Sequence, residues 1–180
     1  LVGSEMCIRD STRITRQRGK MQIAISEQET IVVPLSLFRE RPLTEGQPIN
    51  LEEYDNWLMV RQYRHALDRA VACLAARAHS KHEIEQKLLR VGYRPCTVEM
   101  VLYKLEREHL LNDADFARQW VEARSGRKLG RSRIAQELRR KGIDADEAEE
   151  ALSAIGEDAQ LADAIALAEK AAARAKSDEN

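Results

Sequence analysis

The chain has 180 residues, with 29 Lys and Arg against 30 Asp and Glu, so its formal net charge at pH 7 is −1. That length accommodates one ordinary domain or a short array of small repeats, and the balanced charge argues against a protein whose whole surface coats nucleic acid. No stretch approaches the roughly 20 consecutive apolar residues that a membrane-spanning helix needs, so we expect no membrane partner. The three cysteines, Cys7, Cys73 and Cys96, form no close pair, which argues against a disulfide framework or a zinc site and favours the reducing cytoplasm.

Residues 1–20 lack the long apolar core of a signal peptide. Their opening, LVGSEMCIRDS, resembles translated adapter sequence, so we expect residues 1–20 to be an artefactual or disordered leader outside the fold. In residues 21–49 the pattern changes, because Met21, Ile23 and Ile25 alternate with polar residues and the β-branched run 30–33 follows a polar spacer. This pattern predicts a small β-hairpin extension, which must pack on the helices that follow it.

A helical period begins at residue 50. Asn50 is a candidate N-cap for a long helix that ends near Arg77, and Tyr63 is a candidate break point within it.

A second helix is predicted from the capping box formed by Ser80 and Glu83. Gly92 suits the left-handed position that ends a helix, and Pro95 suits the first position of a third.

The chain repeats itself. A shift of 50 residues aligns 84–105 with 134–155 without a gap. The identical pairs are Ile84 and Ile134, Gln86 and Gln136, Leu88 and Leu138, Arg90 and Arg140, Gly92 and Gly142, Glu99 and Glu149, and Leu102 and Leu152. The sequence therefore predicts an all-α fold of tandem three-helix repeats, with repeat 1 at residues 50–111 and repeat 2 at 112–155. Residues 156–180 supply one more helix of a third, truncated repeat.

Positive charge is concentrated in repeat 2. The segment 118–141 has nine cations against two glutamates, a net charge of +7, whereas 142–180 has three cations against eleven acids, a net charge of −8. A cationic stripe of this density attracts a polyanion or an acidic protein groove. The predicted partner-binding residues are Arg118, Arg124, Arg127, Lys128, Arg131, Arg133, Arg139, Arg140 and Lys141.

The sequence names no catalytic residue, no cofactor and no metal site. Asp113 and Asp115 are interpreted as first-turn acids of a helix capped by Asn112, because acids there favour the helix dipole. His79 and His82 have no third ligand nearby in the sequence, and no glycine-rich phosphate loop occurs. We therefore expect a binding protein rather than an enzyme.

Three spaced motifs resemble the RecX regulatory proteins of bacteria. They are Leu74-x-x-Arg77-x-x-Ser80-x-x-Glu83-Ile84-x-x-Lys87-Leu88 with Gly92-Tyr93, then Leu111-Asn112-Asp113-x-x-Phe116-Ala117, and Gly130-x-x-x-Ile134-x-x-Glu137-Leu138-x-x-Lys141-Gly142-Ile143. The resemblance implies a protein that binds the RecA filament on single-stranded DNA and limits its ATPase, strand-exchange and coprotease activities. We expect the chain to be a monomer. The alternative from the residues themselves is a helical module that binds nucleic acid directly.

Overall fold

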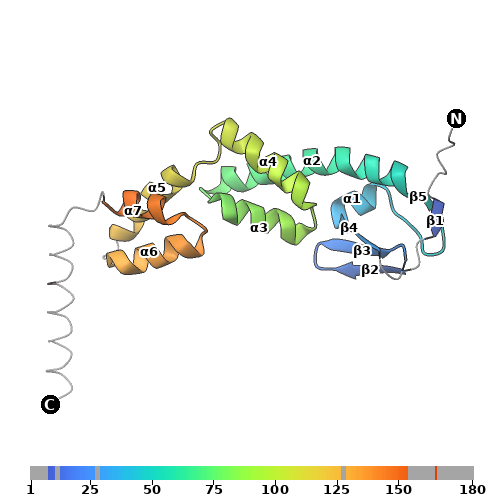
Figure 1. Ribbon diagram of the computed structural model, residues 1–180, viewed down its shortest axis with the longest axis horizontal. Coiled ribbons are helices and arrows are strands. Elements are labelled where there is room, and N and C mark those ends of the chain that lie inside the picture. The colour runs from blue at the N-terminus through green and yellow to red at the C-terminus, as the bar shows by residue number, and fades with distance from the viewer. Residues whose placement is uncertain (1–7, 11–12, 27–28, 127–128, 154–164, 166–180) are drawn as a thin grey trace, which may run out of the picture. The chain divides into compact units, whose positions relative to one another are not determined.

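The structure is a computed structural model that describes residues 8–10, 13–26, 29–126, 129–153 and 165 (Figure 1). The chain divides into two compact units. The first comprises the residues up to His79 together with Glu83–Leu111, and the second comprises Ser80–His82 and the chain from Asn112.

The first unit opens with a three-stranded antiparallel sheet in the order β2 (Arg13–Gln17), β3 (Lys20–Ala24) and β4 (Thr30–Pro34). Met21 and Ile23 are buried on one face and lie opposite Val33 and Ile31 of β4. Because side chains alternate across a strand, this face carries the apolar half of the pattern. The β-hairpin predicted from that alternation is therefore confirmed.

Residues before the hairpin also take part in the fold, which corrects our expectation that 1–20 lies outside it. Strand β2 extends the hairpin to three strands, and β1 (Ile8–Asp10) pairs with β5 (Pro48–Asn50). The strand character of β2 comes from pairing with β3, since most of its side chains are exposed and it has no apolar alternation of its own.

Four helices complete the first unit: α1 (Leu35–Glu40), α2 (Leu51–Ala76), α3 (Lys81–Val91), whose first two residues are grouped with the second unit, and α4 (Pro95–Arg107). Helix α1 packs on β3 and β4, and α2 packs on α4 (Figure 1). As predicted, Asn50 caps α2, its side chain accepting a 3.1 Å hydrogen bond from the Glu53 N–H. The break proposed at Tyr63 is wrong, because α2 is continuous.

The turn between α3 and α4 is fastened to α2 by two polar contacts. The Arg94 N–H donates a 3.0 Å hydrogen bond to Oε1 of the buried Gln62. The Arg94 guanidinium binds both carboxylate oxygens of Asp55, which holds the pKa of that carboxyl below its ordinary value. Pro95 occupies the first turn of α4, where its missing N–H has no intrahelical partner to lose.

The second unit contains α5 (Asp113–Ser125), α6 (Arg131–Arg140) and α7 (Ala145–Ser153), which all pack against one another (Figure 1). Asn112 caps α5 as predicted, accepting a 3.1 Å hydrogen bond from the Asp115 N–H. Its buried core consists of Phe116, Ala117, Val121, Ile134, Leu138, Ile143, Ala148, Ala151 and Leu152.

Gly92 and Gly142 occupy equivalent bends in the two units. Both have positive φ, 100° and 76°, at the residue that ends the second helix of a repeat. The following residues, Tyr93 and Ile143, are both buried and donate their N–H groups to the carbonyls of Leu88 and Leu138. The two turns thus share the same helix-ending motif, as the internal repeat predicts.

The third repeat expected at 156–180 lies outside the described residues, apart from residue 165. The boundaries of repeats 1 and 2, at 50–111 and 112–155, stay a prediction from the sequence. None of the helices formed by described residues combines the length and the apolar character that crossing a bilayer requires.

Candidate functional site

The basic segment 118–141 falls on α5, on α6 and on the connection between them. Two of its nine predicted binding residues, Arg127 and Lys128, lie outside the described residues. The other seven divide into cations engaged within the unit and cations that face solvent without a described ion-pair partner.

Arg124 and Lys141 surround the side chain of Trp120. The Arg124 guanidinium carbon lies 4.2 Å from the Trp120 ring centroid, and the Lys141 Nζ lies 4.0 Å from it. Glu137 of α6 contacts both Trp120 and Arg124 of α5. Its Oε2 accepts a 3.1 Å hydrogen bond from the Trp120 Nε1–H and lies 2.8 Å from Arg124 Nε. These cation–π and ionic contacts join α5 to α6, so Arg124 and Lys141 have a positioning role within the unit.

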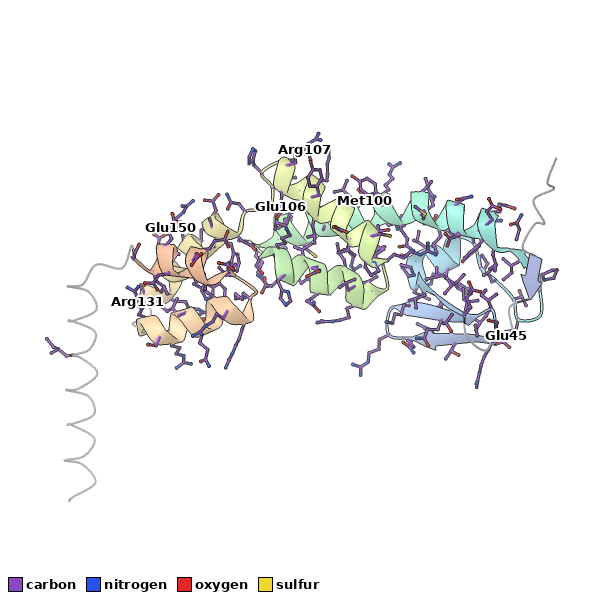
Figure 2. All side chains as sticks on the ribbon, viewed as in Figure 1. Glu45, Met100, Glu106, Arg107, Arg131 and Glu150 are labelled. Carbon is purple, nitrogen blue, oxygen red and sulfur yellow. The ribbon has the colours of Figure 1, made fainter. Side chains whose placement is uncertain are left out.

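Arg118 and Arg131 also have carboxylate partners within the unit. Arg118 pairs with Asp115 one turn earlier on α5. Arg131, at the start of α6 and labelled in Figure 2, pairs with Glu149 of α7. Both pairs are partly exposed, and such pairs contribute about 0 to 1 kcal/mol of stability each. An external anion can therefore replace Asp115 or Glu149 as the partner of the arginine with little loss of folding free energy.

Arg133, Arg139 and Arg140 are exposed and make no ion pair with another described residue. They lie on the solvent side of α6, opposite the buried Ile134 and Leu138. Arg139 and Arg140 occupy the last turn, where positive charge stabilises the helix dipole. Arg133 lies in the first turn, where positive charge is unfavourable, so helix stability does not account for it.

Both three-helix units match models of a known family. Residues 66–105 match the model described as RecX, first three-helix domain, and residues 112–152 match RecX, second three-helix domain. The chain belongs to the RecX family. The resemblance found in the sequence motifs is therefore confirmed.

Named relatives agree with this assignment. The chain is 44% identical over 90 residues to the regulatory protein RecX of Prosthecochloris aestuarii, covering 49% of this chain and 60% of the relative. It is 41% identical over 106 residues to RecX of Halorhodospira halophila, covering 57% of this chain and 63% of the relative. The matched segments thus span about 60% of the length of these curated relatives.

Solved RecX structures share the fold. A crystal structure of regulatory protein RecX superposes with a TM-score of 0.65 at 23% identity, covering 94% of this chain and 85% of the other. The crystal structure of RecX from Lactobacillus salivarius gives a TM-score of 0.62 at 26% identity, covering 65% of this chain and 77% of the other.

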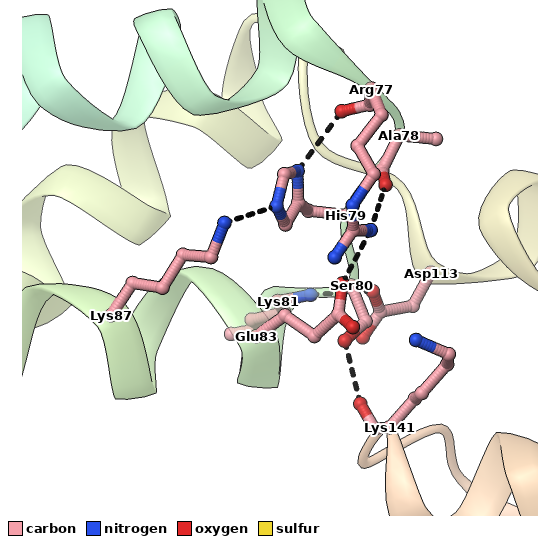
Figure 3. Close-up of polar contacts among 9 residues, drawn as sticks. All are labelled: Arg77, Ala78, His79, Ser80, Lys81, Glu83, Lys87, Asp113 and Lys141. Atoms are coloured by element: carbon pink, nitrogen blue, oxygen red, sulfur yellow. Dashed lines mark hydrogen bonds and ion pairs between the residues drawn. The ribbon is translucent and has the colours of Figure 1, made fainter.

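Ser80, which belongs to the first RecX-like motif, and the neighbouring Lys81 make hydrogen bonds within the second unit. The Ser80 Oγ–H donates a 2.6 Å hydrogen bond to the Lys141 carbonyl, and the Lys81 N–H donates a 2.8 Å bond to Asp113 Oδ1 (Figure 3). Helix α3 begins directly after Ser80, where the capping box predicts its start. Asp113 therefore satisfies an N–H of the first turn of α3, a role that the sequence spacing does not reveal.

His79 is buried and both of its ring nitrogens have partners in the first unit. Nδ1 lies 3.0 Å from the Arg77 carbonyl and Nε2 lies 2.5 Å from Lys87 Nζ (Figure 3). Burial, the largest influence, lowers the pKa of His79. A neutral ring that donates from Nδ1 and accepts from the Lys87 ammonium fits both contacts.

Proposed function

We propose that this chain binds a RecA filament on single-stranded DNA and restrains it, acting by binding rather than by catalysis. The basis is the family, whose curated members are named regulatory proteins, together with the cations of the second unit. The observation that carries the proposal is the exposed set Arg133, Arg139 and Arg140, three cations on one short helix without a described carboxylate partner.

The chemistry of this set suits a groove that contains both phosphate and protein carboxylates. Arginine forms paired, charge-assisted hydrogen bonds to either group. The ion-paired Arg118 and Arg131 can add to the attraction by exchanging carboxylates of their own chain for an external anion. Arg124 and Lys141 would instead hold α5 and α6 in place through Trp120.

The test is the rate of ATP hydrolysis by RecA on single-stranded DNA, with this chain added below equal stoichiometry. We expect the unaltered chain to lower the rate. The triple variant Arg133→Glu, Arg139→Glu and Arg140→Glu should lower it far less, because the anions of the filament would then meet like charge.

A matched control is the triple variant Arg16→Glu, Arg64→Glu and Arg107→Glu, which makes the same charge change at exposed positions of the first unit. The control should inhibit like the unaltered chain. Equal inhibition by all three proteins would contradict the assignment of the surface. No inhibition by any of them would contradict the proposed function, and tight binding to naked duplex DNA would favour the alternative of a direct DNA-binding module.

A further inference from the structure

The internal repeat retains two exposed polar residues, a glutamine and an arginine, that core packing does not require; a last-turn cation favours the helix dipole, but a lysine would serve that purpose as well as the arginine does. Among the seven identical pairs, four are explained by structure: three are buried core positions and one is the glycine of the turn. Gln86 and Gln136, and likewise Arg90 and Arg140, are exposed in both units. Core packing therefore does not account for their identity.

The surroundings of these residues have diverged while the residues themselves have not. Next to them, Glu83 corresponds to Arg133, so the sign of the charge is reversed between the repeats. Lys87 likewise corresponds to Glu137, and Leu89 corresponds to Arg139. A general preference for one kind of surface would have kept such neighbours alike.

Intrachain contacts do not account for the retained residues either. Neither glutamine and neither arginine makes a hydrogen bond or an ion pair with another described side chain. Even a direct contact between the glutamine and the arginine four residues later would stabilise the helix by at most about 0.5 kcal/mol. The third exposed identity differs in this respect, since Glu149 is used within its unit by Arg131.

We propose that each three-helix unit places one Gln–Arg pair, Gln86 with Arg90 and Gln136 with Arg140, on a phosphate of single-stranded DNA. Residues four apart on a helix lie side by side, so the amide and the guanidinium can both donate to one anionic group. Both side chains are common phosphate ligands. Equivalent pairs in successive repeats suit a ligand that presents the same group again and again, as the phosphodiester backbone does.

This inference rests on the proposed function for its biological partner, the DNA of a filament, but it is tested on bare DNA. The affinity of the full chain for a short labelled oligothymidylate is measured by fluorescence anisotropy across a series of NaCl concentrations. Each phosphate contact on a single strand contributes about 0.7 to the slope of log K against log [salt]. Arg90→Ala and Arg140→Ala should each reduce the slope by about 0.7, and the double variant by about 1.4.

Two sets of variants separate this contact from general charge. Arg107→Ala, at an exposed arginine of α4 (Figure 2), removes the same charge and should leave the slope unchanged. Gln86→Ala and Gln136→Ala should each weaken binding about fivefold without changing the slope, because a neutral donor releases no counterion. Circular dichroism of each variant should match that of the unaltered chain, since all five positions are exposed.

The inference is overturned if the chain shows no salt-dependent binding to the oligonucleotide, or if Arg107→Ala changes the slope as much as the paired arginines do. It is also overturned if the arginine variants lose filament binding with unchanged slopes, because the pairs would then contact protein carboxylates. If the slopes change as expected but the chain does not inhibit the ATPase of RecA, only the proposed function is contradicted.

Discussion

Replacing Gly142 by alanine should destabilise the second unit strongly, for two reasons that can be separated. Its φ of 76° lies in the left-handed region, which costs an L-residue about 1 kcal/mol or more. A Cβ at this position would also lie 2.4 Å from His82 Cβ and 2.6 Å from His82 Cγ. Overpacking of this kind typically costs about 1 to 3 kcal/mol, so we expect Gly142→Ala to lower the free energy of unfolding by about 3 kcal/mol.

Two control glycines isolate the two effects. Gly46 has almost the same φ, 77°, but no atom within 4 Å of an added Cβ, so Gly46→Ala should cost about 1 kcal/mol from backbone strain alone. Gly130, in the same unit as Gly142, has negative φ and open space, so Gly130→Ala should cost about 0.5 kcal/mol.

The measurement is urea denaturation followed by circular dichroism. If Gly142→Ala proves as mild as Gly46→Ala, then His82 does not pack on the turn between α6 and α7, and the close packing of this turn would be refuted.

Three further changes test individual contacts by denaturation. Arg94→Met should cost about 1 kcal/mol near neutral pH, since the pair is partly exposed. Arg94 lowers the pKa of Asp55, so the difference in free energy of unfolding between Arg94→Met and the unaltered chain should vanish as acid protonates the carboxyl. If that difference persists in acid, the lost packing of the Arg94 side chain is responsible instead. Burial lowers the pKa of His79, so the unfolded chain binds more protons and stability should fall as pH drops through about 6.5; His79→Gln should lose less stability than the unaltered chain over that range, and parallel pH profiles would contradict this. Trp120→Phe removes a donor to Glu137 and should cost about 1 kcal/mol, whereas an unchanged midpoint would show that the hydrogen bond does not stabilise the unit.

The helices and their turns could be predicted from the sequence because their signals are local. Asn50 and Asn112 cap the helices that follow them, Pro95 opens one, and Gly92 and Gly142 end two others. Each of these residues acts through its own backbone or a group within one turn of the helix.

Features that depend on distant partners could not be predicted. The strand β2 owes its conformation to β3, and its own residues are mostly exposed. Among the predicted binding residues, charge alone does not distinguish Arg131, which reaches Glu149 on another helix, from Arg133, which has no described partner. Only the tertiary packing of α6 against α5 and α7 separates the positioning cations from the accessible ones.

The continuity of α2 has a mechanical consequence. The match to the family's first three-helix domain begins at residue 66, inside this 26-residue helix. Tyr54 and Leu58, in the half before that point, and Ala66 and Ala70, in the half after it, are buried in one cluster with Ile23 and Val33 of the sheet. One continuous helix, about 39 Å long, thus joins the segment before residue 66 to the segment after it. The sheet should therefore unfold in the same cooperative transition as the helices of the first unit. A shortened protein that starts at residue 66 would lose Tyr54 and Leu58, and would expose to water the core residues that pack against them.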